Sequence, residues 1–337
     1  MADCPMVLHI RIFSPAEVTD RVLALLEHDP EVSALSVHRG DSLIPKGDVV
    51  TADVAREGAN AIIDALRDMG LHRTGTIHIE AVDTWLSQGG FAAERAAPGA
   101  SADAVVWAEV GSRAYADTEL NWTYITFMAL ATLLAGIAIV LDAPILVVGA
   151  MVLGPEFGPI AAIGLALVRR RGELLRRALR TLVLGFVVAI GFTFLVGMVL
   201  RMLGWVSIAD LTAERPGTAF IYTPDKWSFL VAVIAAAAGV LSLTSARLGG
   251  ISGVFISVTT VPAAGNVGLG LAFGAWDEVE GSLLQLALNL SGMMIAGWLT
   301  LVVQQAVWSR TYELQRRRHA ERAQGDGRAP WLRRPAP

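Results

Sequence analysis

Charged side chains are scarce in the middle of this 337-residue chain. Asp, Glu, Lys and Arg make up 17% of the residues, against about a quarter in ordinary soluble domains. Residues 119–308 carry only 20 of these side chains, whereas the other 147 residues carry 38. A soluble domain would not leave so long a segment nearly uncharged, so we expect the middle of the chain to lie in a lipid bilayer.

Several further absences narrow the class of protein. The single Cys4 excludes a disulfide framework and a zinc site built on cysteines. The first 13 residues contain no apolar run long enough for the core of a signal peptide, so we expect none. The sequence lacks a Walker A motif, a dinucleotide-binding fingerprint and a His-Glu-x-x-His pair. We therefore expect neither an enzyme nor a resident cofactor or metal.

The charges that are present divide the chain into three parts. Residues 1–118 hold nine Lys and Arg against 18 Asp and Glu, and residues 309–337 hold eight Arg against three acids. An acidic head, a neutral apolar body and a basic tail are typical of a membrane protein with parts in water. The arginines of the tail could set the membrane topology and contact anionic lipid, or they could bind nucleic acid. Because the head is acidic and its strands lack the basic, aromatic platform that stacks bases, we expect no nucleic-acid partner.

Residues 6–84 show the pattern of a small α+β domain. Leu8, Ile10 and Ile12 alternate with polar residues, as in a half-buried strand. A helical segment follows, then two more alternating segments, a second helical segment and a closing strand. The order β-α-β-β-α-β predicts a soluble ferredoxin-like domain over residues 1–86, with two helices on one face of an antiparallel sheet.

The other face of that sheet is expected to carry His9, His38 and His78. These histidines could form a metal or ligand site, or they could belong to a polar face that packs against a second copy of the chain. The fold alone does not decide between these functions. We expect the second arrangement, and hence a homo-oligomer.

Residues 87–120 have the composition of a linker followed by a helix that leads into the membrane from about Ala104. After it, six spans of roughly 20 residues each fit the apolar pattern of residues 121–308. They cover residues 121–141, 144–168, 179–201, 227–246, 248–274 and 282–308. Residues 309–337 form the basic tail, which we expect in the cytoplasm.

The distribution of arginine predicts the orientation of the spans. Six arginines lie between Arg169 and Arg180, after the second span, and more follow the sixth, whereas Asp277, Glu278 and Glu280 precede the sixth. Positively charged loops remain in the cytoplasm. Because an even number of spans puts both termini on one side, we expect both termini in the cytoplasm.

Two of the spans contain helix-breaking sequences. The second contains a Gly-Pro-Glu-Phe-Gly-Pro run at residues 154–159, and the fifth contains Val-Pro-Ala-Ala-Gly-Asn at residues 261–266. Proline removes a backbone donor and clashes with the preceding turn, so we expect both spans to be broken. Broken helices at membrane depth are tolerated where protein or a water-filled cavity satisfies the freed backbone groups.

The two breaks also match in register. A shift of 103 residues places Gly136 on Gly239 and Pro159 on Pro262. Three spans with a break in the second, followed by the same pattern, predict an inverted three-plus-three repeat, which points to a transport site near the midplane. The alternative is that the breaks only let the helices pack closely.

Glu156 is the only acid deep inside an expected span. A charge at the bilayer centre costs at least ~2.5 kcal/mol, so this carboxylate is the first candidate for a functional group. It could cap the helix that restarts at Pro159, or it could bind a cation or a proton. We expect Asp142 to be a turn residue. The expected ion or solute pathway consists of Glu156, Gly154, Pro155, Gly158, Pro159, Thr259, Thr260, Pro262, Asn266 and Asn289.

The stretch ATLLAGIAIVLDAPILVVGAMVLGPEFGPIAAIGLAL, with VPAAGNVGLGLAFG and LALNLSGM downstream, resembles a family of hydrophobic bacterial membrane proteins, the domain of unknown function 389. The resemblance covers roughly residues 121–300. Where the family tends to show Val-Pro-Pro, Ala263 follows Pro262 here, so the second break is expected to be milder. Asn289 matches an asparagine of the family. The resemblance implies a multi-pass protein of the bacterial inner membrane and supplies no activity.

These observations predict a transporter or channel for a small ion or solute, regulated or assembled through its soluble head. The alternative is a membrane-anchored sensor or scaffold, in which the head binds a ligand or partner and the spans only assemble. An enzyme is the weaker class, because Glu156 has no paired base or metal in the sequence. The expected partners are the lipid bilayer, a second copy of the chain and a small solute.

Overall fold

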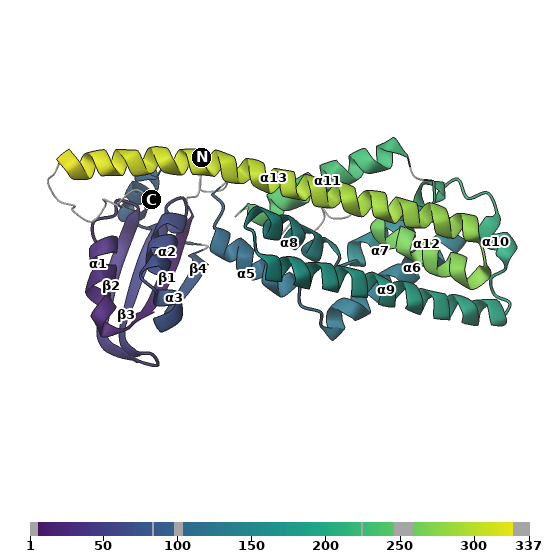
Figure 1. Ribbon diagram of the computed structural model, residues 1–337, viewed down its shortest axis with the longest axis horizontal. Coiled ribbons are helices and arrows are strands. Elements are labelled where there is room, and N and C mark those ends of the chain that lie inside the picture. Colours follow the sequence, from purple (N-terminus) through teal and green to yellow (C-terminus); the bar gives the residue numbers. More distant parts are fainter. Residues whose placement is uncertain (1–5, 83, 98–103, 224, 246–258, 326–337) are drawn as a thin grey trace. The chain divides into compact units, whose positions relative to one another are not determined.

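The computed structural model describes residues 6–82, 84–97, 104–223, 225–245 and 259–325, with side chains as far as Val307 (Figure 1). The chain forms two compact units. The first is built on the residues up to Val110, and the second holds most of the apolar body.

The N-terminal unit contains a four-stranded antiparallel sheet with the strand order β2-β3-β1-β4. The side chains of β1 alternate between its two faces. Leu8, Ile10 and Ile12 are at most 1% exposed, and a fully buried side chain of this size contributes roughly 1.5–3 kcal/mol. The elements are β1 (Val7–Ser14), α1 (Ala16–Leu26), β2 (Val32–Leu43), β3 (Lys46–Ala55), α2 (Ala59–Asp68), α3 (Leu71–Thr74) and β4 (Thr76–Val82).

Helices α1 and α2 supply the other half of this core. Val22 and Leu26 of α1 and Ile62 and Leu66 of α2 are almost fully buried, and they belong to the same hydrophobic cluster as the inward residues of the strands. Their spacing of four residues places each pair on one face of its helix. The elements therefore lie where the sequence pattern predicts them.

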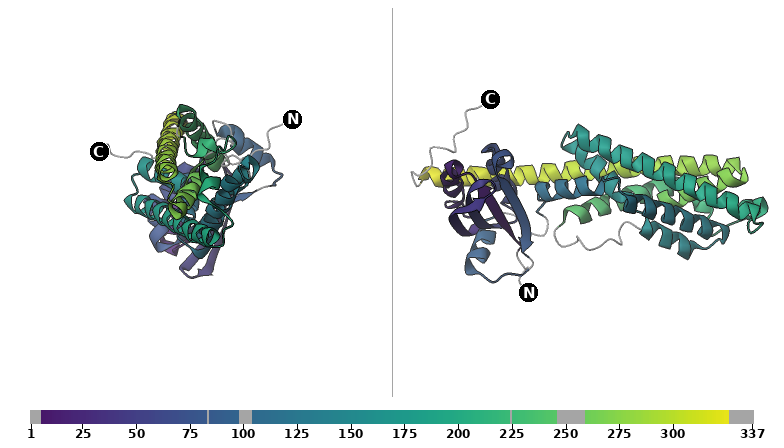
Figure 2. Two further views of the ribbon diagram at one scale, coloured as in Figure 1. Left: turned by 90° about the vertical axis from the view of Figure 1, so that its right-hand side faces the viewer. Right: turned by 90° about the horizontal axis from the view of Figure 1, so that it is seen from below.

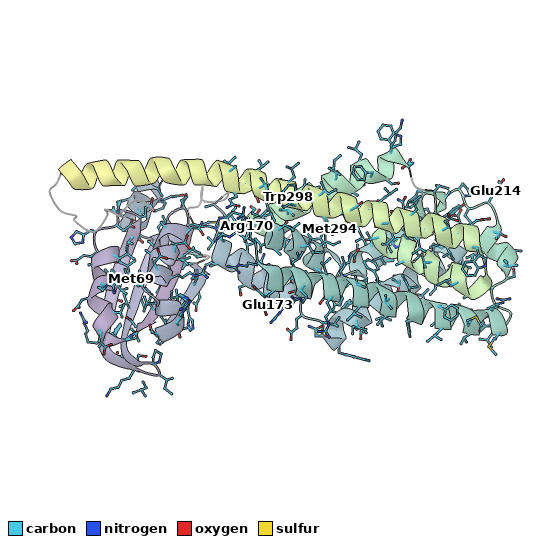
Figure 3. All side chains as sticks on the ribbon, viewed as in Figure 1. Met69, Arg170, Glu173, Glu214, Met294 and Trp298 are labelled. Atoms are coloured by element: carbon cyan, nitrogen blue, oxygen red, sulfur yellow. The ribbon has the colours of Figure 1, made fainter. Side chains whose placement is uncertain are left out.

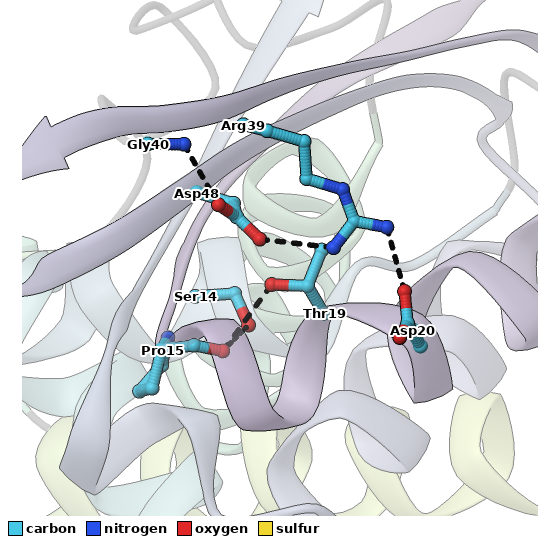
Figure 4. Close-up of polar contacts among 7 residues, drawn as sticks. All are labelled: Ser14, Pro15, Thr19, Asp20, Arg39, Gly40 and Asp48. Atoms are coloured by element: carbon cyan, nitrogen blue, oxygen red, sulfur yellow. Dashed lines mark hydrogen bonds and ion pairs between the residues drawn. The ribbon is translucent and has the colours of Figure 1, made fainter.

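A polar cluster ties the long β2–β3 hairpin to α1 (Figure 4). Asp48 accepts hydrogen bonds from the backbone N–H of Gly40 (2.8 Å) and from Arg39 (3.2 Å). Arg39 also donates to Asp20 of α1 (2.6 Å). Hydrogen bonds from Gly40 and from the Thr19 hydroxyl lower the pKa of Asp48, because they stabilise its ionised form.

The segment expected to be a linker is partly helical. Helix α4 (Gln88–Ala96) begins after Ser87, whose side chain accepts from the N–H of Gly90 (3.2 Å). Ala93 and Ala97 pack against Ala55 of β3. The small residues that suggested a linker thus allow a close helical contact. Helix α5 (Trp107–Asp117) lies where the lead-in helix was expected.

The apolar unit contains helices that are long and apolar enough to cross a bilayer. Among the described residues there are four such helices, or five if one bent pair is counted as a single span. The chain is therefore an integral, multi-pass membrane protein. The four helices are α6 (Trp122–Val140), α9 (Gly172–Met202), α11 (Lys226–Thr244) and α13 (Trp276–Gly325), and the bent pair is α7 (Pro144–Leu153) and α8 (Phe157–Val168).

Five of the six expected spans correspond to these four helices and the bent pair. The fifth expected span, 248–274, falls partly on residues 246–258, which lie outside the described residues. The remainder of it is α12 (Thr260–Phe273), whose 14 residues are shorter than the roughly 20 that cross a bilayer. The total of six spans therefore stays a prediction.

The two expected helix breaks have different outcomes. The first is confirmed, because α7 ends at Leu153, α8 begins at Phe157, and the two helices meet at a bend of 53°. The second is not found at residues 261–266, which are helical and belong to the first turns of α12, and a break before Thr260 would fall on residues outside the described ones. Pro262 is the third residue of that helix, where a backbone N–H has no intrahelical partner, so proline removes nothing there.

Helix α12 lies at the centre of the apolar unit (Figures 1 and 2). Every one of its residues except Leu271 is buried, and it packs against α6, α7 and α9. Gly265 approaches α6 closely, since a Cβ there would lie 2.6 Å from the backbone oxygen of Thr132. In a lipid bilayer the hydrophobic effect does not drive helices together, and small residues let the helices approach closely enough for van der Waals packing.

The two ends of the apolar unit carry opposite charges (Figure 3). Arg170 lies at one end of the helices and Glu214 at the other. The arginines from Arg176 to Arg180 had been expected in a loop, but they belong to the first turns of α9. The connection between α9 and α11 contains α10 (Ile208–Thr212) and a short 3-10 helix, η2 (Ala219–Ile221).

We predict that Gly265→Ala destabilises the protein by about 1–3 kcal/mol, because a backbone atom cannot move aside for the added methyl group. Gly191→Ala in α9 is the matched control, since a Cβ there meets no atom within 4 Å. Thermal unfolding of the two detergent-solubilised variants measures the difference. Equal midpoints would show that the α6–α12 contact is looser than described.

Candidate functional site

Glu156 lies in the bend between α7 and α8 and is 6% exposed. Gly154 precedes it in the bend. A Cβ on Gly154 would collide with Oε2 of Glu156 and would lie 2.6 Å from Val261 of α12. The bend can therefore approach the start of α12 only because a glycine stands at this position.

The carboxylate of Glu156 joins the bend between α7 and α8 to the start of α12. Its Oε1 accepts a hydrogen bond from the hydroxyl of Thr260 (2.7 Å), the first residue of α12. Its Oε2 is buried and has no hydrogen-bond partner among the residues that the structure describes. Glu156 occupies the N-cap position of α8 but makes no side-chain cap bond, so the capping role considered from the sequence is wrong.

Two polar side chains of α13 donate hydrogen bonds to Thr259. Its Oγ1 accepts from Nδ2 of Asn289 (2.7 Å) and from Nε2 of Gln285 (3.2 Å). Both amide side chains are buried. Their carbonyl oxygens have no hydrogen-bond partner within the described part of the chain. Thr259, Thr260 and Asn289 were all expected near Glu156, and these contacts bring them to the start of α12.

Asn266 belongs to a different part of the unit. It lies seven residues after Thr259 on α12, which is about 10 Å along a helix. Its Nδ2 donates to Oε2 of Glu278 (2.7 Å) and to Oγ of Ser282 (2.8 Å), both on α13. Asn266 is therefore not a direct neighbour of Glu156, contrary to the expected grouping.

A buried ion pair completes this second group. Arg215 donates from Nη2 to Oε1 of Glu278 (2.6 Å), and its guanidinium lies over the ring of Tyr222 at 5.0 Å. Arg215 is 3% exposed. This pair was not expected from the sequence, because Glu278 was assigned to an outer turn and Arg215 lies in a connection 63 residues earlier.

The polar residues of α13 share one face, and the sequence contained that signal. Glu278, Ser282, Gln285 and Asn289 follow one another at spacings of four, three and four residues. This spacing places side chains on a single helix face. Of these four residues, only Asn289 was expected at the site from the sequence.

The remaining expected residues have structural positions around the bend. Pro159 is buried in the first turn of α8. Gly158 packs against Asp117, since a Cβ there would lie 2.9 Å from Cβ of Asp117. Asp117, the last residue of α5, was also missed. Burial raises the pKa of this carboxyl, and the nearby charge of Arg113 opposes the rise.

Asp142 has the expected role in a turn. It has a positive φ of 46° between α6 and α7. Its carboxylate accepts from the hydroxyl of Thr218 (2.9 Å) and from the N–H of Gly217 (3.2 Å). It thereby holds the connection that contains Arg215.

The histidines of the sheet are distributed along its outer face. Nδ1 of His9 lies 2.6 Å from Oδ1 of Asp53 on β3, and His78 packs edge-on against Phe13 at 5.4 Å. His38 lies 3.6 Å from Asp41. No three His, Cys, Asp or Glu side chains come together as a metal site in the described ranges.

Comparison with known proteins finds a similarity over the segment that contains the bend and α12. The model of the domain of unknown function DUF389 matches residues 151–295. The resemblance to this family is confirmed. An uncharacterized protein of Methanocaldococcus jannaschii is 25% identical over 173 residues, which are 50% of this chain and 51% of the relative. The chain thus matches about half the length of that relative. No solved structure matches the chain.

The bond between Glu156 and Thr260 predicts energetic coupling. Thr260→Val removes the hydroxyl, and Glu156→Leu removes the carboxylate that accepts from it. We expect a double-mutant cycle of unfolding free energies in detergent to show a coupling of about 1–3 kcal/mol, as for a hydrogen bond to a charged group. Thr300→Val is the control, because its hydroxyl bonds only its own helix at Ala296. Additive effects of the two changes would contradict the bond.

Proposed function

We propose that this protein is a transporter or channel for a small ion or solute, with its site where the bend between α7 and α8 meets the start of α12. The observation that carries the proposal is Glu156, a buried carboxylate with one unpaired oxygen inside a bent span. Such a group costs at least ~2.5 kcal/mol at the bilayer centre, and acids retained there commonly lie on ion or proton pathways.

The bounds of the helices support an inverted repeat. The first residues of α6 and α11 are 104 positions apart, those of α8 and α12 are 103 apart, and those of α9 and α13 are 104 apart. In both halves a proline is the third residue of the central helix. Three spans per copy would invert the second copy in the membrane, and sites between such copies are typical of secondary transporters.

The soluble unit would regulate or assemble the membrane unit. Its strand order, with β1 between β3 and β4, supports the ferredoxin-like assignment. Assembly into a homo-oligomer through the outer face of the sheet stays a prediction.

We further propose that the protein lies in the bacterial cytoplasmic membrane with both termini in the cytoplasm. The support is the arginine-rich end at Arg170 and the opposite end at Glu214 (Figure 3). In a Cys4→Ser background, we expect an impermeant thiol reagent added to intact cells to label Glu214→Cys and to spare Glu173→Cys. Both side chains are exposed in the structure. The reverse pattern would invert the orientation.

The role of Glu156 can be tested by flux. We expect Glu156→Gln to assemble normally in proteoliposomes but to pass solute at about one tenth of the wild-type rate or less, since a lost interaction of roughly 1.4 kcal/mol is a factor of ten. The probes are sodium, potassium, protons and chloride. Glu280→Gln is the control, because the same change is made at an exposed acid near one end of α13.

Two outcomes would count against the proposal. Equal flux through wild-type protein and Glu156→Gln would move the site away from the bend. Absence of flux above empty liposomes for every probe, with correctly assembled wild-type protein, would favour the sensor or scaffold function.

A further inference from the structure

The contact between α12 and α13 is polar along two turns of an otherwise apolar unit. We name it the α12–α13 seam and define it by Thr259 and Asn266 of α12 and by Glu278, Ser282, Gln285 and Asn289 of α13. The four residues of α13 are 9%, 0%, 0% and 1% exposed. Polar side chains on a helix that crosses a bilayer turn towards protein or water and away from lipid.

Hydrogen bonding between the helices accounts for only part of the seam. Oδ1 of Asn266, Oε1 of Gln285 and Oδ1 of Asn289 are buried and have no partner among the described groups. A buried polar atom left without a partner costs about 1–3 kcal/mol. A seam that served packing alone would contain no buried polar atoms without a hydrogen-bond partner.

The orientation of the Asn266 amide is fixed by its neighbour. An ionised carboxylate only accepts hydrogen bonds, so the Nδ2 group must face Glu278. The carbonyl oxygen of Asn266 is then the side left unpaired. The unpaired atoms of the three seam amides are oxygens, and Oε2 of Glu156 is unpaired as well. Carbonyl and carboxylate oxygens are the ligands that hard cations prefer.

The charges along this line suit a single positive charge. Glu278 is already paired with Arg215, so that pair contributes no net charge. Glu156 has a hydroxyl partner and no ion pair with a cationic side chain in the described part of the chain, and it lies next to Thr259 through its bond to Thr260. One uncompensated carboxylate at the inner end of the seam matches a monovalent cation.

We propose that the α12–α13 seam is the route by which a monovalent metal cation, sodium or potassium, reaches Glu156 from the end of the unit that carries Arg215. This inference rests on the proposed transport function and adds the class of solute and the path. The route runs past Asn266 and Ser282, then Gln285 and Asn289, to the bend. The ion pair of Arg215 and Glu278 marks its outer end.

Thiol accessibility tests the route. In a Cys4→Ser background, Ser282→Cys replaces a hydroxyl by a thiol of similar size at the middle of the seam. The probes are a cationic and an anionic methanethiosulfonate reagent. We expect the cationic reagent to modify Ser282→Cys roughly 100-fold faster than a dry, buried thiol, because thiol reactivity follows access to water. Modification should also block cation flux.

Thr193→Cys is the matched control. Thr193 is 0% exposed in the same unit, but it packs between α9 and α6, where its hydroxyl bonds Thr132 (3.1 Å). Gln285→Cys provides a second position on the seam if Ser282→Cys fails to assemble. Faster reaction of the seam position with the cationic reagent than with the anionic one supports the proposal.

Three results would overturn the inference separately from the proposed function. If Ser282→Cys and Gln285→Cys are as unreactive as Thr193→Cys while flux still depends on Glu156, the seam is dry and the route lies elsewhere. A preference for the anionic reagent would exclude a cation. Proton flux without sodium or potassium flux would replace the metal cation by a proton.

Discussion

The apolar unit depends on one hydrogen bond between residues that are 104 positions apart. The Thr260 hydroxyl donates to Glu156 and so joins the bend of α7 and α8 to the first turn of α12. A charge in hydrocarbon requires such a partner, and a partner from the same helix is not used here. Gly154 makes the approach possible, because a side chain at that position would occupy the space of the carboxylate and of Val261. The bend, the glycine and the threonine therefore form one arrangement.

The polar groups of this unit differ from ordinary interhelical hydrogen bonds in their number and in their incomplete pairing. Thr132 and Thr193 illustrate the ordinary case, in which two hydroxyls bond each other or a backbone carbonyl and leave nothing unpaired. Along α12 and α13 the pairing is one-sided, since each amide uses its N–H and leaves its oxygen unpaired. Such incomplete pairing is expected where solvent or a solute supplies the remaining contacts.

The sequence predicted the features that depend on local composition. Two prolines and two glycines in six residues indicated the bend at 154–159, and alternation indicated the strands of the head. The helix at 261–266 was mistaken for a break, because one proline looks the same at the third position of a helix as in its interior. The pair of Arg215 and Glu278 could not be found from spacing, since its members come from a connection and a distant helix. Helix α4 was missed because alanine and glycine are common to linkers and to closely packed helices.

The composition of α12 has a consequence for how the protein is made. Its Thr, Pro, Asn and three Gly residues give it little affinity for lipid, and only Leu271 among its residues is not buried. A segment of this kind gains its stability from neighbouring helices and not from the hydrocarbon. During biogenesis α12 therefore has to pack against α6 and α9, which are synthesised before it. Its place in the chain, after α6, α7 and α9 and before α13, suits that order of assembly.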